Sequence, residues 1–316
     1  MKRTLRFSWI AILMLALFLT GCASNDDQKS TEKQDPKTTE DVKAYTVTDD
    51  NGKEITFDKV PKTVVSLQPS NTEILYALGV GDKVIGATDY DNYPEEAKEV
   101  ERVSDSMTIN SEKIIALKPD IILAYTIGDE ATLKPLEDAG IPIFIIKSAV
   151  NFDDVYGDIN QIAEVMGVTE KGNELVQTIQ TQIKDVEDKV ANVDSKEKTY
   201  FEISPSPEIY TAGAETFQQE ILASAGIDNI FTDQKGWAKI ADEEVVKRNP
   251  DTIITTVGYV ENAVDEIKSR KGWGNISAVK QNQVYQLNED VMSRPGPRIG
   301  EAVELAAKTV YPELFK

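Results

Sequence analysis

Glu112-Lys-Ile-Ile-Ala-Leu-Lys-Pro119-Asp120 is the stretch that decides the fold of this chain. It predicts a helix of two turns that ends before the proline, because proline disfavours helical backbone in the residue before it. A buried strand is expected from Ile121 onward. The same pattern, with a glutamate seven residues before Pro-Asp, returns from Glu243 to Asp251. The chain therefore carries one helix–proline–strand unit in each half.

A second pair of matching segments precedes the first pair in the same order. It consists of Glu73-Ile-Leu-Tyr-Ala-Leu-Gly79 and Glu220-Ile-Leu-Ala-Ser-Ala-Gly226. Two ordered matches favour the duplication of one structural unit. The alternative is that α/β domains reuse a common helix–proline–strand connection by chance. With duplication, the chain folds into two similar βα lobes.

Short apolar runs alternate with helical segments in both halves of the chain. This alternation predicts parallel βαβ units. The expected strands cover residues 63–67, 84–87, 120–124, 141–146, 200–203, 253–257 and 284–287. Asn51-Gly52 predicts a hairpin turn ahead of them. We therefore expect the α/β class, with two similar lobes, each a mainly parallel sheet flanked by helices.

A long helix is expected between the two halves, from Thr169 to about Val190. Its apolar residues recur at steps of three and four, which is typical of a helix with one buried face. It is interpreted as a rigid connection between two lobes, with an ordinary surface helix or a short coiled coil as alternatives. The expected boundaries are an N-terminal lobe at 45–168, a connecting helix at 169–192 and a C-terminal lobe at 193–316. A ligand cleft is expected between the lobes, and one helical connection predicts only small closure.

The N-terminus has the layout of a secretory signal: three basic residues, then an apolar run from Phe7 to Leu19. Leu19-Thr20-Gly21-Cys22 resembles a bacterial lipobox, and Cys22 is the only cysteine of the chain. We expect a signal peptide at 1–21, a lipid on Cys22 and a disordered tether at 22–44. A single-pass anchor is the alternative, although the apolar run is shorter than the ~20 residues that a span needs. The predicted location is the extracytoplasmic face of a bacterial cell membrane.

Composition excludes several kinds of function. The net charge of −20 argues against nucleic-acid binding through a basic surface. The chain has no histidine, and its single cysteine belongs to the lipobox. A serine–histidine triad, a cysteine nucleophile and a histidine zinc site are thereby excluded. Carboxylate chemistry stays open, for instance a surface hydrolase that pairs Asp290 with Asp89 or Asp91, though no spacing demands it. No catalytic residue, metal or cofactor is predicted.

Aromatic residues follow the predicted strands at several points, where parallel sheets place their ligand sites. Tyr90, Tyr125, Tyr210 and Tyr259 stand at such positions, and Trp237 stands in a glycine-containing loop before the second repeated helix. Each alone could pack under a loop, but as a set they predict the lining of a cleft for a large, flat ligand. Arg294 and Arg298 flank a Pro-Gly-Pro turn in an otherwise acidic chain. We expect Arg294 to contact the ligand and Arg298 to be structural.

Residues 62–316 resemble the solute-binding proteins of ABC importers for iron-siderophores, haem and vitamin B12. The matching pieces are Ser66-Leu-Gln-Pro-Ser-Asn-Thr-Glu73, Tyr90-Asp-Asn-Tyr-Pro94, Asn110 to Asp120, Trp237 to Asp251 and Arg294-Pro-Gly-Pro-Arg298. The vitamin B12-binding members are the most similar. The resemblance implies a lipid-anchored, monomeric receptor that captures a corrinoid and delivers it to a permease and an ATPase. The alternatives are the same role for a ferric siderophore or haem and, from other classes, the hydrolase or a structural lipoprotein.

The resemblance also implies roles for individual residues. Those expected at the ligand are Pro69, Ser70, Tyr90, Tyr125, Tyr210, Trp237, Asp290 and Arg294. A tryptophan that the family carries just before Asn110 has no match, since Ser106 and Met107 stand there. Glu112 and Glu243 match glutamates that dock, one from each lobe, with arginines of the membrane subunits. On their own, both would be explained as acids in a first helical turn, stabilised by the helix dipole.

Overall fold

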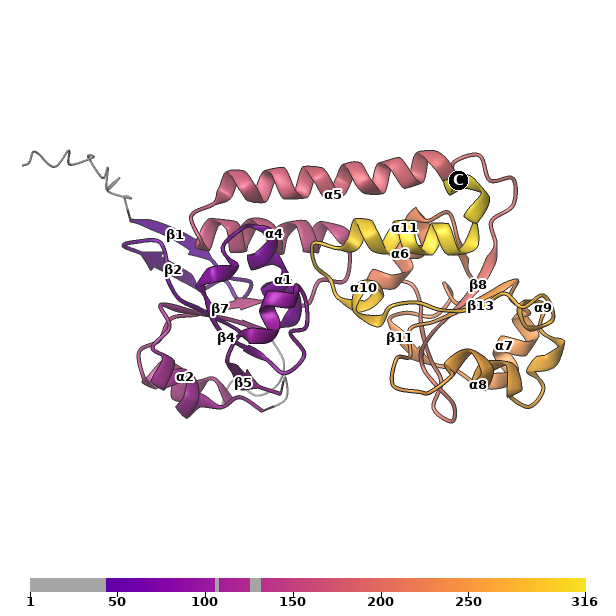
Figure 1. The fold of residues 1–316 in the computed structure, drawn as a ribbon, viewed down its shortest axis with the longest axis horizontal. Helices are drawn as coiled ribbons and strands as arrows, with labels where there is room; N and C mark the ends of the chain where they lie inside the picture. Colours follow the sequence, from indigo (N-terminus) through magenta and orange to yellow (C-terminus); the bar gives the residue numbers. More distant parts are fainter. Residues whose placement is uncertain (1–43, 106–107, 126–131) are drawn as a thin grey trace, which may run out of the picture. The chain divides into compact units, whose positions relative to one another are not determined.

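The computed structural model describes residues 44–105, 108–125 and 132–316 (Figure 1). The predicted signal peptide at 1–21, the lipidation of Cys22 and all but the last residue of the tether at 22–44 lie outside these residues. Residues 42–316 form one compact unit. Within the described residues, no helix is both long enough and apolar enough to cross a membrane.

The N-terminal lobe is built on a five-stranded parallel sheet with the strand order β5-β4-β3-β6-β7. A separate antiparallel hairpin, β1 and β2, precedes it around the predicted Asn51-Gly52 turn, where Gly52 has a φ of 80°. The strands are β1 (Tyr45–Thr48), β2 (Glu54–Phe57), β3 (Val64–Ser66), β4 (Val84–Thr88), β5 (Arg102–Ser104), β6 (Ile121–Tyr125) and β7 (Ile143–Ile146). β3, β6 and β7 are almost wholly buried, as expected for strands of a covered parallel sheet.

The C-terminal lobe has a mixed six-stranded sheet. β8, β12 and β13 are parallel neighbours, β10 pairs with β8, and β9 and β11 extend the sheet in antiparallel fashion. The strands are β8 (Lys198–Ser204), β9 (Tyr210–Ala212), β10 (Asp228–Asn229), β11 (Trp237–Lys239), β12 (Thr252–Thr255) and β13 (Val284–Gln286). Tyr210 and Trp237, both expected in loops, instead begin β9 and β11. Strands of three residues are too short to show a clear alternating pattern.

Helices cover the sheets and join the lobes. They are α1 (Pro69–Ala77), α2 (Ser111–Leu117), α3 (Lys134–Asp138), α4 (Phe152–Val165), α5 (Thr169–Val190), α6 (Phe217–Ser224), α7 (Asp242–Arg248), α8 (Ala263–Ser269), α9 (Ser277–Lys280), α10 (Glu289–Ser293) and α11 (Ile299–Val310). Short 3₁₀ turns lie at Gly81–Lys83, Glu95–Glu99, Trp273–Asn275 and Pro312–Phe315. The predicted fold class, two mainly parallel α/β lobes joined by a long helix, is confirmed.

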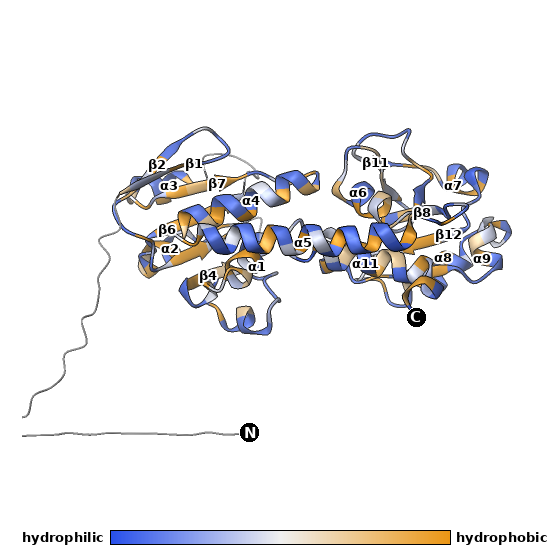
Figure 2. Cartoon of the chain, turned by 90° about the horizontal axis from the view of Figure 1, so that it is seen from above, coloured by the Kyte–Doolittle hydropathy of each residue, from blue (hydrophilic) through white to orange (hydrophobic). Residues whose placement is uncertain are grey.

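α5 runs along both lobes and packs against α4 at one end and α11 at the other (Figures 1 and 2). Its buried stripe consists of Ile179, Ile183, Val186 and Val190. The backbones approach closely at Gly172, where an added Cβ would stand 2.6 Å from the Cβ of Ala163. One continuous hydrophobic core runs from the N-terminal lobe through this helix layer into the C-terminal lobe. The lobes are therefore parts of one packed body.

The repeated sequence segments have matching structures. α2 and α7 both end at a residue with left-handed backbone, Lys118 (φ 51°) and Asn249 (φ 47°), before the buried Pro119 and Pro250. β6 and β12 follow and occupy equivalent positions, beside β3 and β8. α1 and α6 both end at a glycine of positive φ, as glycine C-caps commonly do. These matches fit the duplication that the sequence predicts.

Asp158 on α4 is a buried carboxyl group with an unusual proton affinity. It is 7% exposed, and burial, followed by the charges of Asp50 and Asp154, raises its pKa to about 8. In the unfolded chain the same group titrates near 3.8. The folded state therefore holds the proton more tightly, and this contribution to stability is complete below about pH 4 and is lost as the pH rises through 8.

We expect Asp158→Asn to stabilise the protein at alkaline pH, because the amide cannot ionise. The gain in the free energy of unfolding should grow between about pH 4 and pH 8 and reach on the order of 2–4 kcal/mol. Urea unfolding at a series of pH values measures it. Asp153→Asn, an exposed acid on the same helix, is the control, and an equal gain from both variants would contradict the assignment to Asp158.

Candidate ligand-binding site

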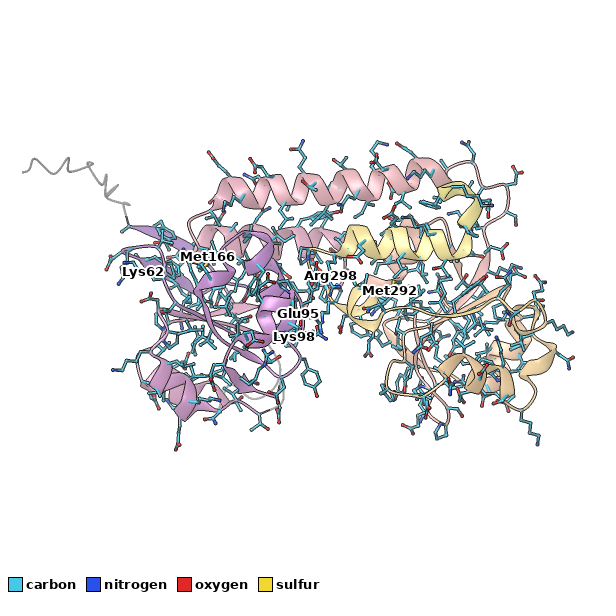
Figure 3. The ribbon with its side chains drawn as sticks, in the orientation of Figure 1. Lys62, Glu95, Lys98, Met166, Met292 and Arg298 are labelled. Atoms are coloured by element: carbon cyan, nitrogen blue, oxygen red, sulfur yellow. The ribbon has the colours of Figure 1, made fainter. Side chains whose placement is uncertain are left out.

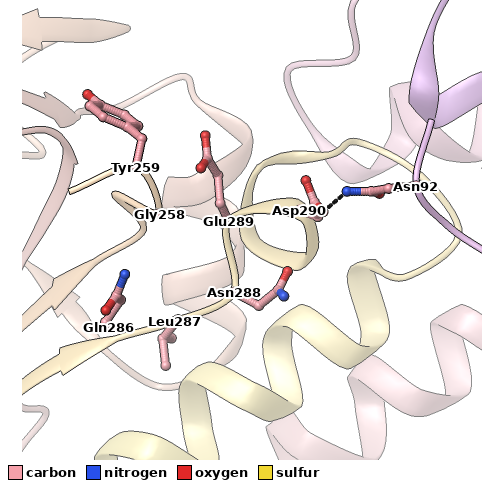
Figure 4. Close-up of a pocket in the computed structure, with 8 residues that line it drawn as sticks. All are labelled: Asn92, Gly258, Tyr259, Gln286, Leu287, Asn288, Glu289 and Asp290. Atoms are coloured by element: carbon pink, nitrogen blue, oxygen red, sulfur yellow. Dashed lines mark hydrogen bonds between the residues drawn. The ribbon is translucent and has the colours of Figure 1, made fainter. Parts of the chain in front are cut away.

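A cavity of about 610 Å³ lies where the N-terminal lobe meets the loops of the C-terminal lobe (Figure 4). Its N-terminal wall is Asn92, from the loop after β4. The remaining residues follow β12 and β13; they are Gly258, Tyr259, Gln286, Leu287, Asn288, Glu289 and Asp290. All but Gln286, the last residue of β13, lie beyond the carboxyl ends of strands, where open α/β sheets place their ligand sites.

Arg294 and Arg298 connect the C-terminal lobe to the N-terminal lobe beside this cavity. Arg294 donates to Glu73 (3.0 Å), to the Asn92 side-chain oxygen (2.8 Å) and to the carbonyl of Tyr90 (2.9 Å). It also pairs with Asp290 on its own helix turn, at 2.7 Å. Figure 3 shows Arg298 near the boundary between the lobes. We call these contacts between the two lobes the cross-lobe network. Within it, the predicted ligand residues Asp290 and Arg294 bind one another.

Glu73 is the centre of this network. Its side chain is 1% exposed, and Arg298 donates two hydrogen bonds to it, at 2.8 and 2.6 Å. The Arg298 guanidinium also lies over the ring of Tyr93, 4.1 Å from its centroid. Burial lowers the pKa of Arg298, but the hydrogen bonds and charge of Glu73 outweigh it and hold that pKa above its ordinary value. Two cations therefore compensate one buried carboxylate.

A second carboxylate, on the C-terminal lobe, makes a contact with the N-terminal lobe. Glu220 of α6 accepts a hydrogen bond from the backbone N–H of Phe152, at the start of α4, with a distance of 2.6 Å. The rings of Phe152 and Phe217 meet edge to face beside it, with centroids 6.0 Å apart. Glu73 and Glu220 occupy matching positions in the sequence repeat. In each lobe, therefore, the glutamate at this position of the repeat contacts the other lobe.

The other residues predicted for the ligand are not among the residues that line this cavity. Ser70 is buried, with its Cα 3.7 Å from where a Cβ on Gly296 would stand, so the first loop lies against the last one. Pro69 begins α1, Tyr125 ends β6 and Tyr210 begins β9. Tyr90 and Trp237 are 60% and 49% exposed. Trp237 donates from Nε1 to the side chain of Gln218, at 3.1 Å.

The structure adds lining residues that were not singled out from the sequence. Asn92, Gln286, Asn288 and Glu289 all face the cavity, yet only Asp290 of the predicted set does so. The rule that ligands bind after strands would have found them, had polar residues been weighed as heavily as aromatic ones. Both Arg294 and Arg298 bind Glu73, so both have a structural contact, and a ligand contact of Arg294 stays a prediction.

Glu112 and Glu243 stand at equivalent places, in the first turns of α2 and α7. Both are exposed, and within the part of the chain that the structure describes neither carboxylate has a hydrogen-bond or ion-pair partner. One lies on each lobe, at the start of a repeated unit. The same described residues contain no group of three or more potential ligands arranged for a metal ion.

Comparison with known proteins assigns the chain to a protein family. A family model for periplasmic binding proteins matches residues 64–291. The chain belongs to the periplasmic binding protein family. Proteins of this family are transport components and not enzymes. This binding protein is 42% identical over 313 residues, 98% of each chain, to the uncharacterized ABC transporter substrate-binding lipoprotein YvrC of Bacillus subtilis.

Two further relatives of this binding protein differ in what their names say they bind. The vitamin B12-binding protein of Yersinia pestis is 34% identical over 242 residues, which cover 75% of this chain and 81% of the relative. A solved structure of a possible iron-binding, periplasmic solute-binding protein from Staphylococcus epidermidis has a TM-score of 0.72 and 34% identity. It covers 80% of this chain, and all of that structure is matched.

Proposed function

We propose that this binding protein captures a corrinoid, such as vitamin B12, between its lobes and delivers it to the permease and ATPase of an ABC importer. The observation that carries the proposal is the cavity after β12 and β13, whose lining includes three side-chain amides, the Tyr259 hydroxyl and two carboxylates. A corrinoid is a broad, flat ring with amide groups around its rim. The name of the 34% identical relative from Yersinia pestis supports the same ligand.

The chemistry of the cavity wall suits amides. Asn288 uses its side-chain oxygen to cap α10, at 2.9 Å from the N of Val291, and Gln286 donates to the carbonyl of Val257 at 2.8 Å. These bonds engage one end of each amide, so the Asn288 N–H₂ and the Gln286 oxygen have no hydrogen-bond partner among the described residues and are available to a ligand. The exposed ring of Tyr259 adds an apolar face and a hydroxyl. Donors, acceptors and a ring face together match an amide-rimmed ligand.

The tether and the docking residues complete the proposal. Cys22, lipidated, would hold the protein on the extracytoplasmic face of the membrane, and the name of the 42% identical lipoprotein YvrC supports this. Glu112 and Glu243, exposed on the two lobes, would pair with cationic side chains of the permease. The receptor would act as a monomer and without a cofactor. A ferric siderophore or haem is the second candidate ligand, because the name of the Staphylococcus epidermidis structure calls that protein a possible iron-binding one.

Thermal unfolding tests the ligand class. The chain from residue 23 would be unfolded with cyanocobalamin, a ferric hydroxamate, a ferric catecholate or haem, each in excess. A ligand at 100 times its dissociation constant adds about 2.7 kcal/mol to the stability of the folded state. We expect the unfolding midpoint to rise with cyanocobalamin alone. A rise only with an iron complex or haem would replace the corrinoid, and no rise with any of the four would contradict the proposal.

A further inference from the structure

The cavity wall is acidic and carries no cation. Of its eight lining residues, Glu289 and Asp290 are acidic and none is a lysine or arginine. The two short stretches outside the described part of the lobes, 106–107 and 126–131, contain no basic residue in their sequence. The whole chain has a net charge of −20. An anionic ligand would therefore meet negative potential in this cavity.

The nearest guanidinium groups are already paired. Arg294 has four protein partners, and two of them, Glu73 and Asp290, are carboxylates at 3.0 and 2.7 Å. Arg298 makes two hydrogen bonds to Glu73. The side chains of the two arginines are only 13% and 14% exposed. To bind an anion, either arginine would have to give up its bonds to the buried Glu73 carboxylate, and weakening a buried ion pair in this way is unfavourable.

Glu289 is different from its neighbour Asp290. The Asp290 carboxylate accepts from Asn92 at 2.8 Å and pairs with Arg294. The Glu289 carboxylate has no hydrogen-bond or ion-pair partner among the described residues, and its side chain is exposed. Its Oε2 lies over Gly258, 3.2 Å from where a Cβ on that residue would stand. Figure 4 shows Glu289 between Tyr259 and Asp290 on the cavity wall.

We propose that Glu289 is a specificity-determining residue that restricts this cavity to neutral or cationic ligands bearing N–H groups. This inference rests on the proposed ligand-binding function of the cavity. The carboxylate accepts hydrogen bonds from amide or ammonium donors of the ligand, and such charge-assisted bonds are strong. Against an anion it acts by repulsion, because Glu73 and Asp290 have already neutralised the two arginines. A negatively charged iron catecholate or a haem dicarboxylate is thereby excluded.

The size of the effect follows from Coulomb's law. A like charge at about 8 Å, with an effective dielectric constant of about 40, weakens binding about fivefold for each unit of ligand charge. A ferric tris-catecholate of charge −3 should therefore bind the Glu289→Gln variant at least tenfold more tightly than the unaltered protein at low ionic strength. Added salt should reduce this difference. Glu289→Lys doubles the change in charge and should raise the affinity at least a hundredfold.

Equilibrium binding of the chain from residue 23 tests the inference, with ferric tris-catecholate and cyanocobalamin as probes. Glu54→Gln, which removes an equal charge from the exposed face of β2, is the control and should change neither affinity more than twofold. Equal affinity of the unaltered protein and both Glu289 variants for the tris-catecholate would overturn the inference. So would the absence of binding by all three at millimolar concentration, because charge would then not be what excludes the anion.

The same measurements separate this inference from the proposed function. If cyanocobalamin fails to bind but the Glu289 variants still gain affinity for the tris-catecholate, the corrinoid is wrong and the role of Glu289 stands. If cyanocobalamin binds and the variants gain nothing, the role of Glu289 is wrong and the corrinoid stands.

Discussion

Replacement of Glu112 and Glu243 together by alanine should abolish ligand uptake while leaving ligand binding unchanged. The two carboxylates are exposed, one on each lobe, and make no ion pair with described residues. Removing them cannot disturb a buried contact, so the fold and the cavity should be unaffected. At a protein–protein interface, by contrast, losing one partner of a charge pair can cost about 2–5 kcal/mol. Two such losses would reduce docking by several powers of ten.

Uptake of labelled ligand by cells that express the importer measures the first effect, and binding to purified receptor measures the second. The double variant Glu54→Ala with Glu313→Ala removes the same charge at exposed positions on β2 and the C-terminal turn. It should transport normally. Unimpaired uptake by the Glu112/Glu243 variant would show that docking uses another surface. Lost ligand binding would show that the substitutions act on the fold instead.

Glu73→Ala should destabilise the folded protein by about 3–5 kcal/mol. The substitution leaves the guanidinium groups of Arg294 and Arg298 without the buried carboxylate that binds both of them. Breaking a buried ion pair by removing one partner has this effect because the remaining charge stays desolvated and uncompensated. Urea unfolding at neutral pH measures the loss as a lower midpoint with little change in slope.

Glu95→Ala is the matched control for this experiment. Glu95 forms an ion pair with Lys98 at 2.7 Å, but the glutamate side chain is 82% exposed (both are labelled in Figure 3). Exposed pairs contribute about 0–1 kcal/mol. Equal losses from Glu73→Ala and Glu95→Ala would contradict a structural role for the cross-lobe network.

The fold could be predicted from the sequence where its signals are local. The helix–proline–strand segments at Glu112 and Glu243 show two parallel α/β units, because a helix end and the strand after it lie within a dozen residues. The antiparallel strands that begin at Tyr210 and Trp237 could not be predicted in this way. Each has three residues, and their pairing depends on contacts with distant parts of the chain.

The site shows the same division between local and distant signals. The rule that ligands bind after strands leads to the loop after β13, whose residue Asp290 lines the cavity, because the rule depends only on topology. The partners of Arg294 depend on contacts across the lobes: Glu73 is 221 residues away in sequence. No sequence feature near Arg294 predicts that its guanidinium is paired with the buried Glu73. Which side chains remain available to a ligand is therefore a property of the assembled lobes.

Glu73 and Glu220, which each contact the opposite lobe, have a consequence for how an importer would recognise a loaded receptor. Besides α5, contacts of Glu73 and of Glu220 join the two lobes. Large hinge motion would break the contacts of both glutamates, so capture of a ligand should leave the radius of gyration in solution scattering almost unchanged. Occupancy would then have to be signalled to the membrane by the ligand's own exposed surface, or by slight changes in the spacing of α2 and α7.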